Sequence, residues 1–444
     1  MGLDASTSKR ASLHTLGCRL NQAETMLLRD KLAASGYTMV PFGEKADLAI
    51  INTCTVTRLA DAKCRQSIRQ FITENPHAYT AVVGCYSQMG AKEIASIPGV
   101  DLILGNQDKL NVLEYIGTGE KNSTPVIVRD RISRDDFSIA FAGERPFNKR
   151  ANLKVQEGCD FVCSFCIIPF ARGRARSRDF LNMLDEANSL ASRGVRELVL
   201  TGVNIGTYGN GGCDIVNVVD ALAQVPGIDR LRISSIEPTT VPPELLDRMA
   251  DPQHPLLPYL HLPLQSGCNR ILHDMRRRYT TEEYAEFARD AVQRIPELCL
   301  GADIMIGFPG ETEEEFDETC RFLLENPFSY AHVFTYSERE GTPAARRSDQ
   351  VPVPLRQKRS AHLRRLSAQR LYDFHAKHLG RTVKVLFEDP SENTWPGYTD
   401  NYIRVVIPAA QVPGKDLANQ MGWVRLDTVT ADFVEGTWIQ TAED

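Results

Sequence analysis

Three cysteines stand close together between Lys154 and Arg178, as Cys159, Cys163 and Cys166 in the spacing CxxxCxxC. A short β-branched run precedes them, so we expect the three thiols to leave a strand end on one tight loop. Three thiolates can hold three irons of a cubane [4Fe–4S] cluster, which normally takes a fourth thiolate. Because no fourth cysteine stands nearby, one iron stays open and can bind and reduce a substrate.

The alternative for this loop is a zinc site that a distant histidine or cysteine completes. Zinc sites usually pair one CxxC with a second CxxC or with two histidines, and this loop has a different spacing. The pattern therefore favours the iron–sulfur cluster.

Three further cysteines each end an apolar run near the start of the chain: SLHTLGC at Cys18, LAIINTC at Cys54 and TAVVGC at Cys85. In an open parallel sheet, binding groups collect just beyond the carboxyl ends of the strands, so these thiols can converge on one site. Helix-compatible segments follow them and would bring helix N-termini near an anionic cluster. The alternative is three ordinary buried cysteines, and their matching positions argue against it. Cys64, within a helical stretch, is interpreted as a packing residue.

Composition limits the class of protein. The 444 residues exceed one core, and the length favours about three domains. A net charge of −6 argues against a generally basic nucleic-acid surface, so RNA contact must come from a local patch. The apolar runs are too short to span a bilayer and the start, MGLDASTSKR, lacks a signal core, which predicts a cytoplasmic protein with no membrane contact. The odd number of cysteines, 11, is inconsistent with full disulfide pairing.

Apolar runs and helical patterns alternate over most of the chain, which predicts an α/β multidomain protein. Residues 10–118 are expected to form a doubly wound α/β domain, and residues 119–148 a linker or an edge strand. Residues 149–375 repeat strand and helix six times, too few for a closed eightfold barrel, which predicts a partial (β/α)6 barrel. Its strand ends TGVNIGTYG, SSIEP, LQSG and GFPGET would form a cradle suited to a nucleoside with an amino acid tail.

Residues 346–384 carry eleven lysines and arginines against two aspartates, a local charge of +9. The pattern over most of this stretch is helical. A solvated helix is the alternative, but a one-sided excess in an acidic protein favours contact with a polyanion. The candidate RNA-binding residues on this helix are Arg364, Arg365 and Arg370.

The last unit, residues 378–441, is short and rich in strand patterns with tight turns, which predicts a small β-barrel. Trp395, Tyr398, Tyr402 and Arg404 bring aromatic rings and a cation together, a combination that can stack and clamp single-stranded RNA. The last three of them are the candidate RNA-binding residues of this unit.

These three units together resemble the methylthiotransferase family: an N-terminal domain with three cysteines, a radical S-adenosylmethionine (SAM) core with CxxxCxxC, and a β-barrel of the TRAM type. Within that family, NTCTVT (52–57), YSEREGTPAA (336–345) and GYTDNYIRV (397–405) look like the branch that methylthiolates N6-threonylcarbamoyladenosine in tRNA. Neighbouring branches act on isopentenyladenosine in tRNA or on an aspartate of a ribosomal protein.

The resemblance implies two [4Fe–4S] clusters, one at Cys159, Cys163 and Cys166, and an auxiliary one at Cys18, Cys54 and Cys85. It implies that SAM serves as methyl donor and as radical source, and that the substrate lies between the clusters. The candidate SAM contacts at the strand ends are Asn204, Ser235, Glu237, Gln265, Asp303 and Gly307. One departure from the superfamily is that residues 201–204 stand where many members have Gly-Gly-Glu.

The expected partners are the anticodon arm of tRNA, an electron donor and a sulfur source. Arg172, Arg176 and Arg178 are candidates to hold the SAM carboxylate or an RNA phosphate, with a surface basic run as the alternative. Three other functions remain open: methylthiolation of isopentenyladenosine in tRNA, methylthiolation of an aspartate of a ribosomal protein, and an iron–sulfur RNA-binding protein without catalysis. The +9 segment and the NTCTVT residues argue against the ribosomal-protein substrate.

Overall fold

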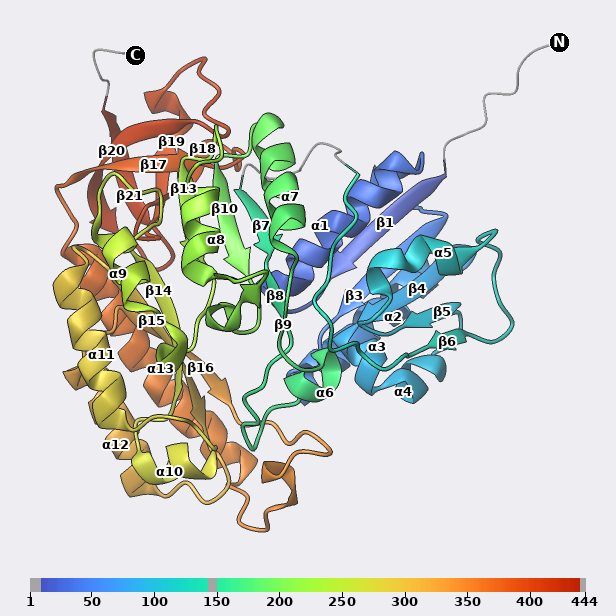
Figure 1. Ribbon diagram of the computed structural model, residues 1–444, viewed down its shortest axis with the longest axis horizontal. Helices are drawn as coiled ribbons and strands as arrows, with labels where there is room; N and C mark the ends of the chain where they lie inside the picture. Colours follow the sequence, from blue (N-terminus) through green and yellow to red (C-terminus); the bar gives the residue numbers. More distant parts are fainter. Residues whose placement is uncertain (1–8, 143–149, 440–444) are drawn as a thin grey trace.

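The computed structural model describes residues 9–142 and 150–439, and Figure 1 shows their arrangement. Most of the segment MGLDASTSKR lies outside the described residues, as do residue 149 and residues 440 and 441 at the edges of the predicted units. Among the described helices, none combines the length and the hydrophobicity that a bilayer crossing requires.

The N-terminal region is a parallel sheet with helices on both faces, as predicted. The strand order is β2-β1-β3-β4-β5-β6. Its strands are β1 (Arg10–Thr15), β2 (Thr38–Val40), β3 (Leu48–Thr53), β4 (Tyr79–Gly84), β5 (Leu102–Leu104) and β6 (Val126–Val128). Its helices are α1 (Arg19–Ala34), α2 (Arg58–Glu74), α3 (Cys85–Met89), α4 (Ala91–Ala95), η1 (Lys109–Asn111) and α5 (Val112–Ile116).

Strand β3 shows why helices cover both faces of this sheet. All six of its residues are buried, and Ile50 packs with α1 and α5 while its neighbour Ile51 packs with α2 and α4. Successive side chains of a strand point to opposite faces, so a continuous apolar run requires cover on both sides. Strand β6 pairs with β5, so the segment predicted as a linker or an edge strand contributes an edge strand.

The central region is the predicted partial barrel of six parallel strands. It consists of two three-stranded sheets, β13-β10-β7 and β14-β15-β16. The sheets approach each other where Leu231 N donates to Pro255 O at 2.8 Å. The strands are β7 (Arg150–Lys154), β10 (Glu197–Thr201), β13 (Arg230–Ile233), β14 (Tyr259–Gln265), β15 (Cys299–Ile306) and β16 (Tyr330–Thr335), with short pairs β8 (Gln156–Glu157) and β9 (Arg176–Ser177), β11 (Gly209–Asn210) and β12 (Cys213–Asp214).

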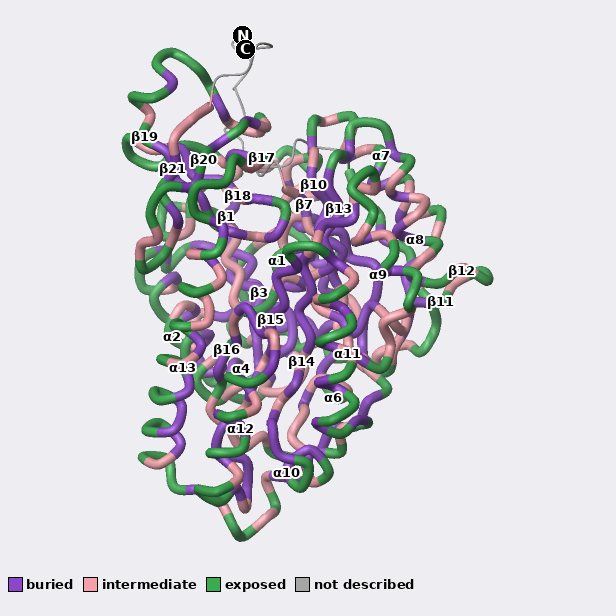
Figure 2. The backbone as a smooth tube through the Cα atoms, turned by 90° about the vertical axis from the view of Figure 1, so that its left-hand side faces the viewer, coloured by how far each residue is buried: buried purple, intermediate pink, exposed green. Residues whose placement is uncertain are grey.

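Helices cover the outside of this barrel, and its strands β10, β13, β14 and β15 are mostly buried (Figure 2). The helices are α6 (Ile168–Arg172), α7 (Phe180–Ser192), η2 (Ile205–Thr207), α8 (Ile215–Leu222), η3 (Pro238–Thr240), α9 (Pro243–Ala250), α10 (Asn269–Asp274), α11 (Thr281–Arg294), α12 (Glu313–Glu325), η4 (Ala344–Arg346) and α13 (Val353–Ala376). Their starts are encoded locally. Thr280 and Glu283 form a capping box on α11, and Thr312 and Glu315 form another on α12.

The C-terminal region is a closed five-stranded barrel, as predicted, with strand order β17-β18-β19-β21-β20. Its elements are β17 (Thr382–Phe387), β18 (Thr394–Thr399), β19 (Arg404–Pro408), η5 (Ala409–Gln411), β20 (Met421–Val429) and β21 (Val434–Ile439). The barrel lies at the amino ends of β10 and β13, where Arg230 Nη1 donates to Tyr398 O at 2.9 Å and Arg232 Nη1 to Asp400 O at 2.9 Å. It therefore covers the end of the central barrel opposite the CxxxCxxC loop.

The junction between α13 and the C-terminal barrel should weaken in acid. Burial and then the nearby His378 lower the pKa of His375 to about 4, so the folded state keeps this ring neutral where the unfolded chain would protonate it. Stability is lost as the pH falls below about 6.5, and at pH 5 the loss should be about 1 to 2 kcal/mol. Denaturant unfolding at pH 7 and pH 5 should show a smaller loss for His375→Gln than for the wild type. Equal losses in the two proteins would contradict this assignment.

Candidate active site

The first three cysteines lie at one edge of the N-terminal sheet. Strands β1, β3 and β4 are neighbours and parallel, so Cys18, Cys54 and Cys85 follow three adjacent carboxyl ends. Gly17 has a φ of +105°, and a Cβ there would stand 2.6 Å from Cys54 Cβ. Only glycine permits this close approach between the loops that carry Cys18 and Cys54.

The second three cysteines lie on one loop beyond β7 and β8. Gly158, with a φ of +72°, precedes Cys159, and a Cβ there would stand 1.9 Å from Arg174 O. Phe161 N donates to Cys159 Sγ at 3.4 Å, and Arg277 Nη1 donates to Cys163 Sγ at 3.3 Å. The loop is thus folded tightly back on the chain, with a buried guanidinium beside one thiol.

The donor set fits an iron–sulfur cluster at each group of three cysteines. All 11 cysteines carry free thiols. Burial raises the pKa of Cys54 and of Cys166 to about 12, and that of Cys159 to about 11. The neighbouring thiols of the same group contribute to these raised pKa values, because the members of each group lie close together. Buried thiols of this kind ionise when a metal compensates their charge.

A cavity of about 190 Å³ lies between the loop that follows Cys54 and the CxxxCxxC loop. Val56 and Thr57 reach it from the loop after Cys54, and Cys166 reaches it from the CxxxCxxC loop. The remaining wall comes from the carboxyl ends of the central strands and the segments beside them: Phe165, Ile167, Ile168, Gln265, Asp303, Met305, Phe334, Thr335, Tyr336 and Ser337. A molecule in this cavity would touch both cysteine loops.

Two sequence motifs meet beside this cavity. Arg339, from YSEREGTPAA, donates to Asp61 Oδ2 at 2.6 Å and to Thr55 Oγ1 at 2.7 Å, and Thr55 belongs to NTCTVT. Ser337 Oγ also accepts from Arg58 N at 3.0 Å. The two segments are almost 300 residues apart in the chain, and together they join the N-terminal sheet to the central barrel.

The predicted SAM contacts occupy different positions around the carboxyl ends. Asn204 is buried; its Oδ1 accepts from Thr240 Oγ1 at 3.0 Å, and its Nδ2 has no partner among the described residues. Glu237 pairs with Arg277, and burial raises the pKa of this carboxyl group. Ser235 is half-buried on the same segment. An unpaired buried amide fits a polar ligand such as SAM.

The other candidates divide into two groups. Gln265, at a φ of +75°, and Asp303 line the cavity. Gly307 instead has a structural role. Its N–H donates to Glu311 Oε2 at 2.8 Å, and a Cβ at this position would stand 2.3 Å from Arg356 Cγ. Its backbone donor is therefore already used.

Two histidines on β14 and β16 escaped the sequence analysis. His261 Nε2 lies 3.0 Å and His332 Nδ1 3.7 Å from Asp303 Oδ1. Both alternate with buried Leu, Ala or Val residues along β14 and β16, so they lie on the opposite face of these strands, where His261 is buried and His332 is exposed. Polar residues at alternate positions of otherwise apolar strands were the signal that could have revealed them.

The arginines after the cysteine loop do not face a ligand. Arg172 is 1% exposed, and its guanidinium group pairs with Glu24 and Glu157. Arg178 is 0% exposed, and its guanidinium group pairs with Glu186. Arg176 is also buried and pairs with Glu157. The prediction that these arginines hold the SAM carboxylate or an RNA phosphate is wrong, and so is the alternative of a surface basic run, because the arginines are buried and paired with carboxylates of other elements.

The candidate RNA-binding tyrosines lie at the junction of the two barrels. Tyr398 and Tyr402 stack on each other at 4.8 Å, and the guanidinium of Arg150 lies 4.6 Å from the Tyr398 ring. Arg232 lies 4.6 Å from the ring of Tyr402. These ring faces are covered, so the structure does not offer them to a base, whereas Arg404 on β19 is exposed.

The basic helix is less available to a polyanion than its charge suggests. Arg356 pairs with Glu338, and Arg359 pairs with Glu311 and Glu313. Arg370 donates to Asn326 O at 2.9 Å and to Phe328 O at 3.0 Å. Arg364 and Arg365 are exposed, although Arg364 also donates to Val333 O at 3.0 Å.

A six-stranded parallel partial barrel with a three-cysteine loop at its carboxyl ends defines a radical SAM fold. Residues 153–323 match the family described as the Radical SAM superfamily, and residues 10–105 match the one described as "Uncharacterized protein family UPF0004". The solved structure of the radical SAM methyltransferase TsrM from Kitasatospora setae has a TM-score of 0.52 and 15% identity, covering 76% of this chain and 77% of that one. This likeness concerns the fold alone.

Two curated relatives are similar in sequence to this chain over most of its length. One from Bacillus subtilis (strain 168) is 38% identical, covering 98% of this chain and 97% of the relative. One from Aquifex aeolicus (strain VF5) is 38% identical, covering 89% and 96%. Both are named threonylcarbamoyladenosine tRNA methylthiotransferase MtaB. The chain therefore belongs to the threonylcarbamoyladenosine tRNA methylthiotransferase family.

Proposed function

We propose that this protein methylthiolates carbon 2 of N6-threonylcarbamoyladenosine next to the anticodon of tRNA, with SAM as methyl donor and as radical source. The observation that carries the proposal is the cavity that touches both cysteine loops and lies beside the meeting point of NTCTVT and YSEREGTPAA. A reaction that uses two clusters on one base requires this arrangement, because the base must reach both.

The ligand assignment follows from the two groups of cysteines. Cys159, Cys163 and Cys166 hold the radical SAM [4Fe–4S] cluster, and Cys18, Cys54 and Cys85 hold the auxiliary one. When bound, cluster and SAM supply the radical chemistry that the unactivated C–H bond at carbon 2 requires and that no side chain provides. The protein contributes a cavity that orients the adenine and excludes water.

Residues at the strand ends hold SAM in this proposal. The unpaired Nδ2 of Asn204 donates to it, and Ser235, Gln265 and Asp303 offer further polar groups. Glu237 acts with Arg277, which spans from this carboxylate to Cys163 Sγ and so joins the SAM cradle to the cluster loop. Gly307 shapes the turn beside them.

Exposed cations bind the RNA in this proposal. Arg364 and Arg365 on α13 and Arg404 on the C-terminal barrel contact phosphates of the anticodon arm. The proposal gives a structural role to Arg370, Tyr398 and Tyr402, which stabilise the elements that carry these exposed cations and do not contact the RNA. Reductive cleavage of SAM consumes an electron and the product gains sulfur, so an electron donor and a sulfur source complete the partners. The proposed location is the cytoplasm, where tRNA is modified.

The test is mass spectrometry of nucleosides from tRNA that carries threonylcarbamoyladenosine. The tRNA is incubated anaerobically with reconstituted protein, SAM, a reductant and sulfide. The 2-methylthio form of that nucleoside should appear, and should be missing when SAM or protein is omitted. If 5′-deoxyadenosine forms without this product, the proposed substrate is wrong, and isopentenyladenosine tRNA and the ribosomal protein become the substrates to assay.

A further inference from the structure

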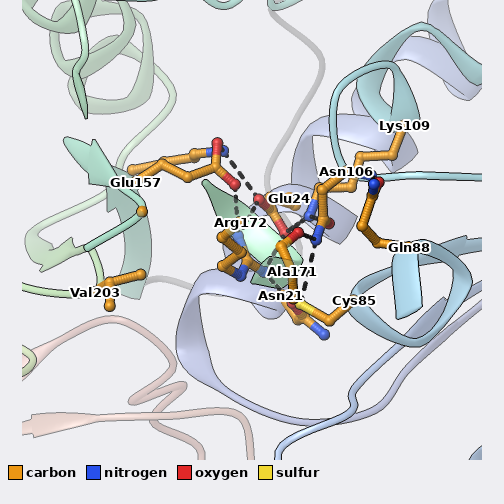
Figure 3. Close-up of polar contacts among 12 residues, drawn as sticks. Asn21, Glu24, Cys85, Gln88, Asn106, Lys109, Glu157, Ala171, Arg172 and Val203 are labelled. Carbon is orange, nitrogen blue, oxygen red and sulfur yellow. Dashed lines mark hydrogen bonds and ion pairs between the residues drawn. The ribbon is translucent and has the colours of Figure 1, made fainter. Parts of the chain in front are cut away.

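A buried ionic network joins the two cysteine regions (Figure 3). Glu24 on α1 of the N-terminal sheet and Glu157 on β8 are its two carboxylates, each 2% exposed or less. Arg172 Nη1 lies 3.0 Å from Glu24 Oε1 and 2.8 Å from Glu157 Oε1. The remaining cations that pair with these carboxylates are Lys109, Lys154 and Arg176.

This network carries more positive than negative charge. In the ion pairs of the described residues, the four cations pair only with Glu24 and Glu157. Four positive charges against two negative charges leave an excess of two positive charges. Buried charge of one sign needs an anionic partner.

The first group of cysteines lies directly beside this excess charge. Asn106 Nδ2 donates to Cys85 Sγ at 3.5 Å and to Ala171 O at 2.6 Å, while its Oδ1 accepts from Lys109 Nζ at 2.7 Å. An anionic cluster at these thiols would supply the missing negative charge.

We propose that Arg172 and Asn106 are positioning residues that raise the reduction potential of the auxiliary cluster, and that they fix the CxxxCxxC loop relative to it. The inference rests on the proposed function, since it takes Cys18, Cys54 and Cys85 as the ligands of that cluster. Nearby positive charge and hydrogen bonds to ligand sulfur favour the reduced, more negative state of a cluster. Both residues act through the ligands and touch no substrate.

The same residues connect the two sites mechanically. Arg172 ends α6, six positions after Cys166, and its guanidinium also donates to Asn21 Oδ1, three positions after Cys18. Asn106 holds the backbone of Ala171 on the same helix. The short helix α6 therefore fixes the position of one cysteine loop relative to the other, across the junction of the N-terminal sheet and the central barrel.

The test measures the auxiliary cluster by itself. In a full-length Cys159→Ala, Cys163→Ala, Cys166→Ala background, reconstituted protein should hold about four irons per chain. A reductive titration followed by electron paramagnetic resonance then gives the midpoint potential. Asn106→Ala and Arg172→Gln should shift it to a more negative value, Arg172→Gln by more, and Arg172→Lys, which keeps the charge, should shift it less.

Arg178→Gln is the matched control. Arg178 is equally buried in the same segment but pairs with Glu186 on α7, so its loss should leave the potential unchanged. If Arg172→Gln fails to fold, Asn106→Ala carries the test, since it changes no charge. Unchanged potentials with full iron content would overturn this inference and leave the ligand assignment standing. A background protein without iron would overturn the ligand assignment and this inference with it.

Discussion

The Cys54→Ala variant should form no detectable 2-methylthio nucleoside while still cleaving SAM to 5′-deoxyadenosine within about twofold of the wild-type rate. The reason is spatial. Cys54 follows β3 of the N-terminal sheet, whereas the cluster proposed to cleave SAM is assigned to the loop from Cys159 to Cys166 in the central barrel. Loss of one ligand should also remove about four irons per chain. Nucleoside mass spectrometry, product analysis of SAM and an iron assay measure the three effects.

Cys64→Ala is the control for this variant. Cys64 is 0% exposed and its thiol donates to Cys54 O at 3.4 Å, so it tests whether a change in packing beside Cys54 has the same effect. It should lower the free energy of unfolding by about 1 kcal/mol and keep both the iron and the product. If Cys54→Ala also loses SAM cleavage, the two groups of cysteines do not have separate roles.

The Cys163→Ala variant should lose both products, because SAM cleavage precedes the transfer. The rate of 5′-deoxyadenosine formation should fall by about 10³-fold or more, since no side chain can replace the radical chemistry. The auxiliary cluster should remain, so the iron content should fall only by about half. Anaerobic single-turnover assays with SAM and dithionite measure the first effect and an iron assay the second.

Cys268→Ala serves as the comparison for that variant. Cys268 is 5% exposed and packs in a small apolar cluster with Ile271, Met275 and the partly buried Phe165 of the cysteine loop. Its loss should change SAM cleavage little. Retention of rapid SAM cleavage by Cys163→Ala would show that this cysteine is not a ligand of the radical SAM cluster.

The strands and their ends could be predicted because their signals are local. β3 reads as a continuous apolar run, and the cysteines at positions 18, 54 and 85 follow such runs directly. Strands β1, β3 and β4 then had to be neighbours for the thiols to meet, and the parallel α/β pattern made that arrangement favourable. The glycines before Cys18 and Cys159 supported this arrangement but were overlooked.

Charged and aromatic residues were the less predictable part of the site. Arg172 pairs with Glu24, 148 residues away in the chain, and Arg232 contacts Asp400, 168 residues away. A local basic pattern shows neither partner, so the sequence left a ligand contact and a surface basic run open for Arg172 and Arg178, whereas both are buried in ion pairs. Tyr398 and Tyr402 were assigned to RNA for the same reason, although they pack against Arg150 and Arg232 at the junction of the barrels.

The reactive groups and the class of fold can be predicted from the amino-acid sequence: six cysteines at strand ends and on one loop, a partial barrel, and a small closed barrel. These follow from residue type and from hydrophobic periodicity, which act over a few positions. The folded structure is needed to show which charged side chains are exposed and which form ion pairs between domains. It is also needed to locate the cavity between the two cysteine loops. The physical reason is that burial and pairing depend on which distant segments pack together.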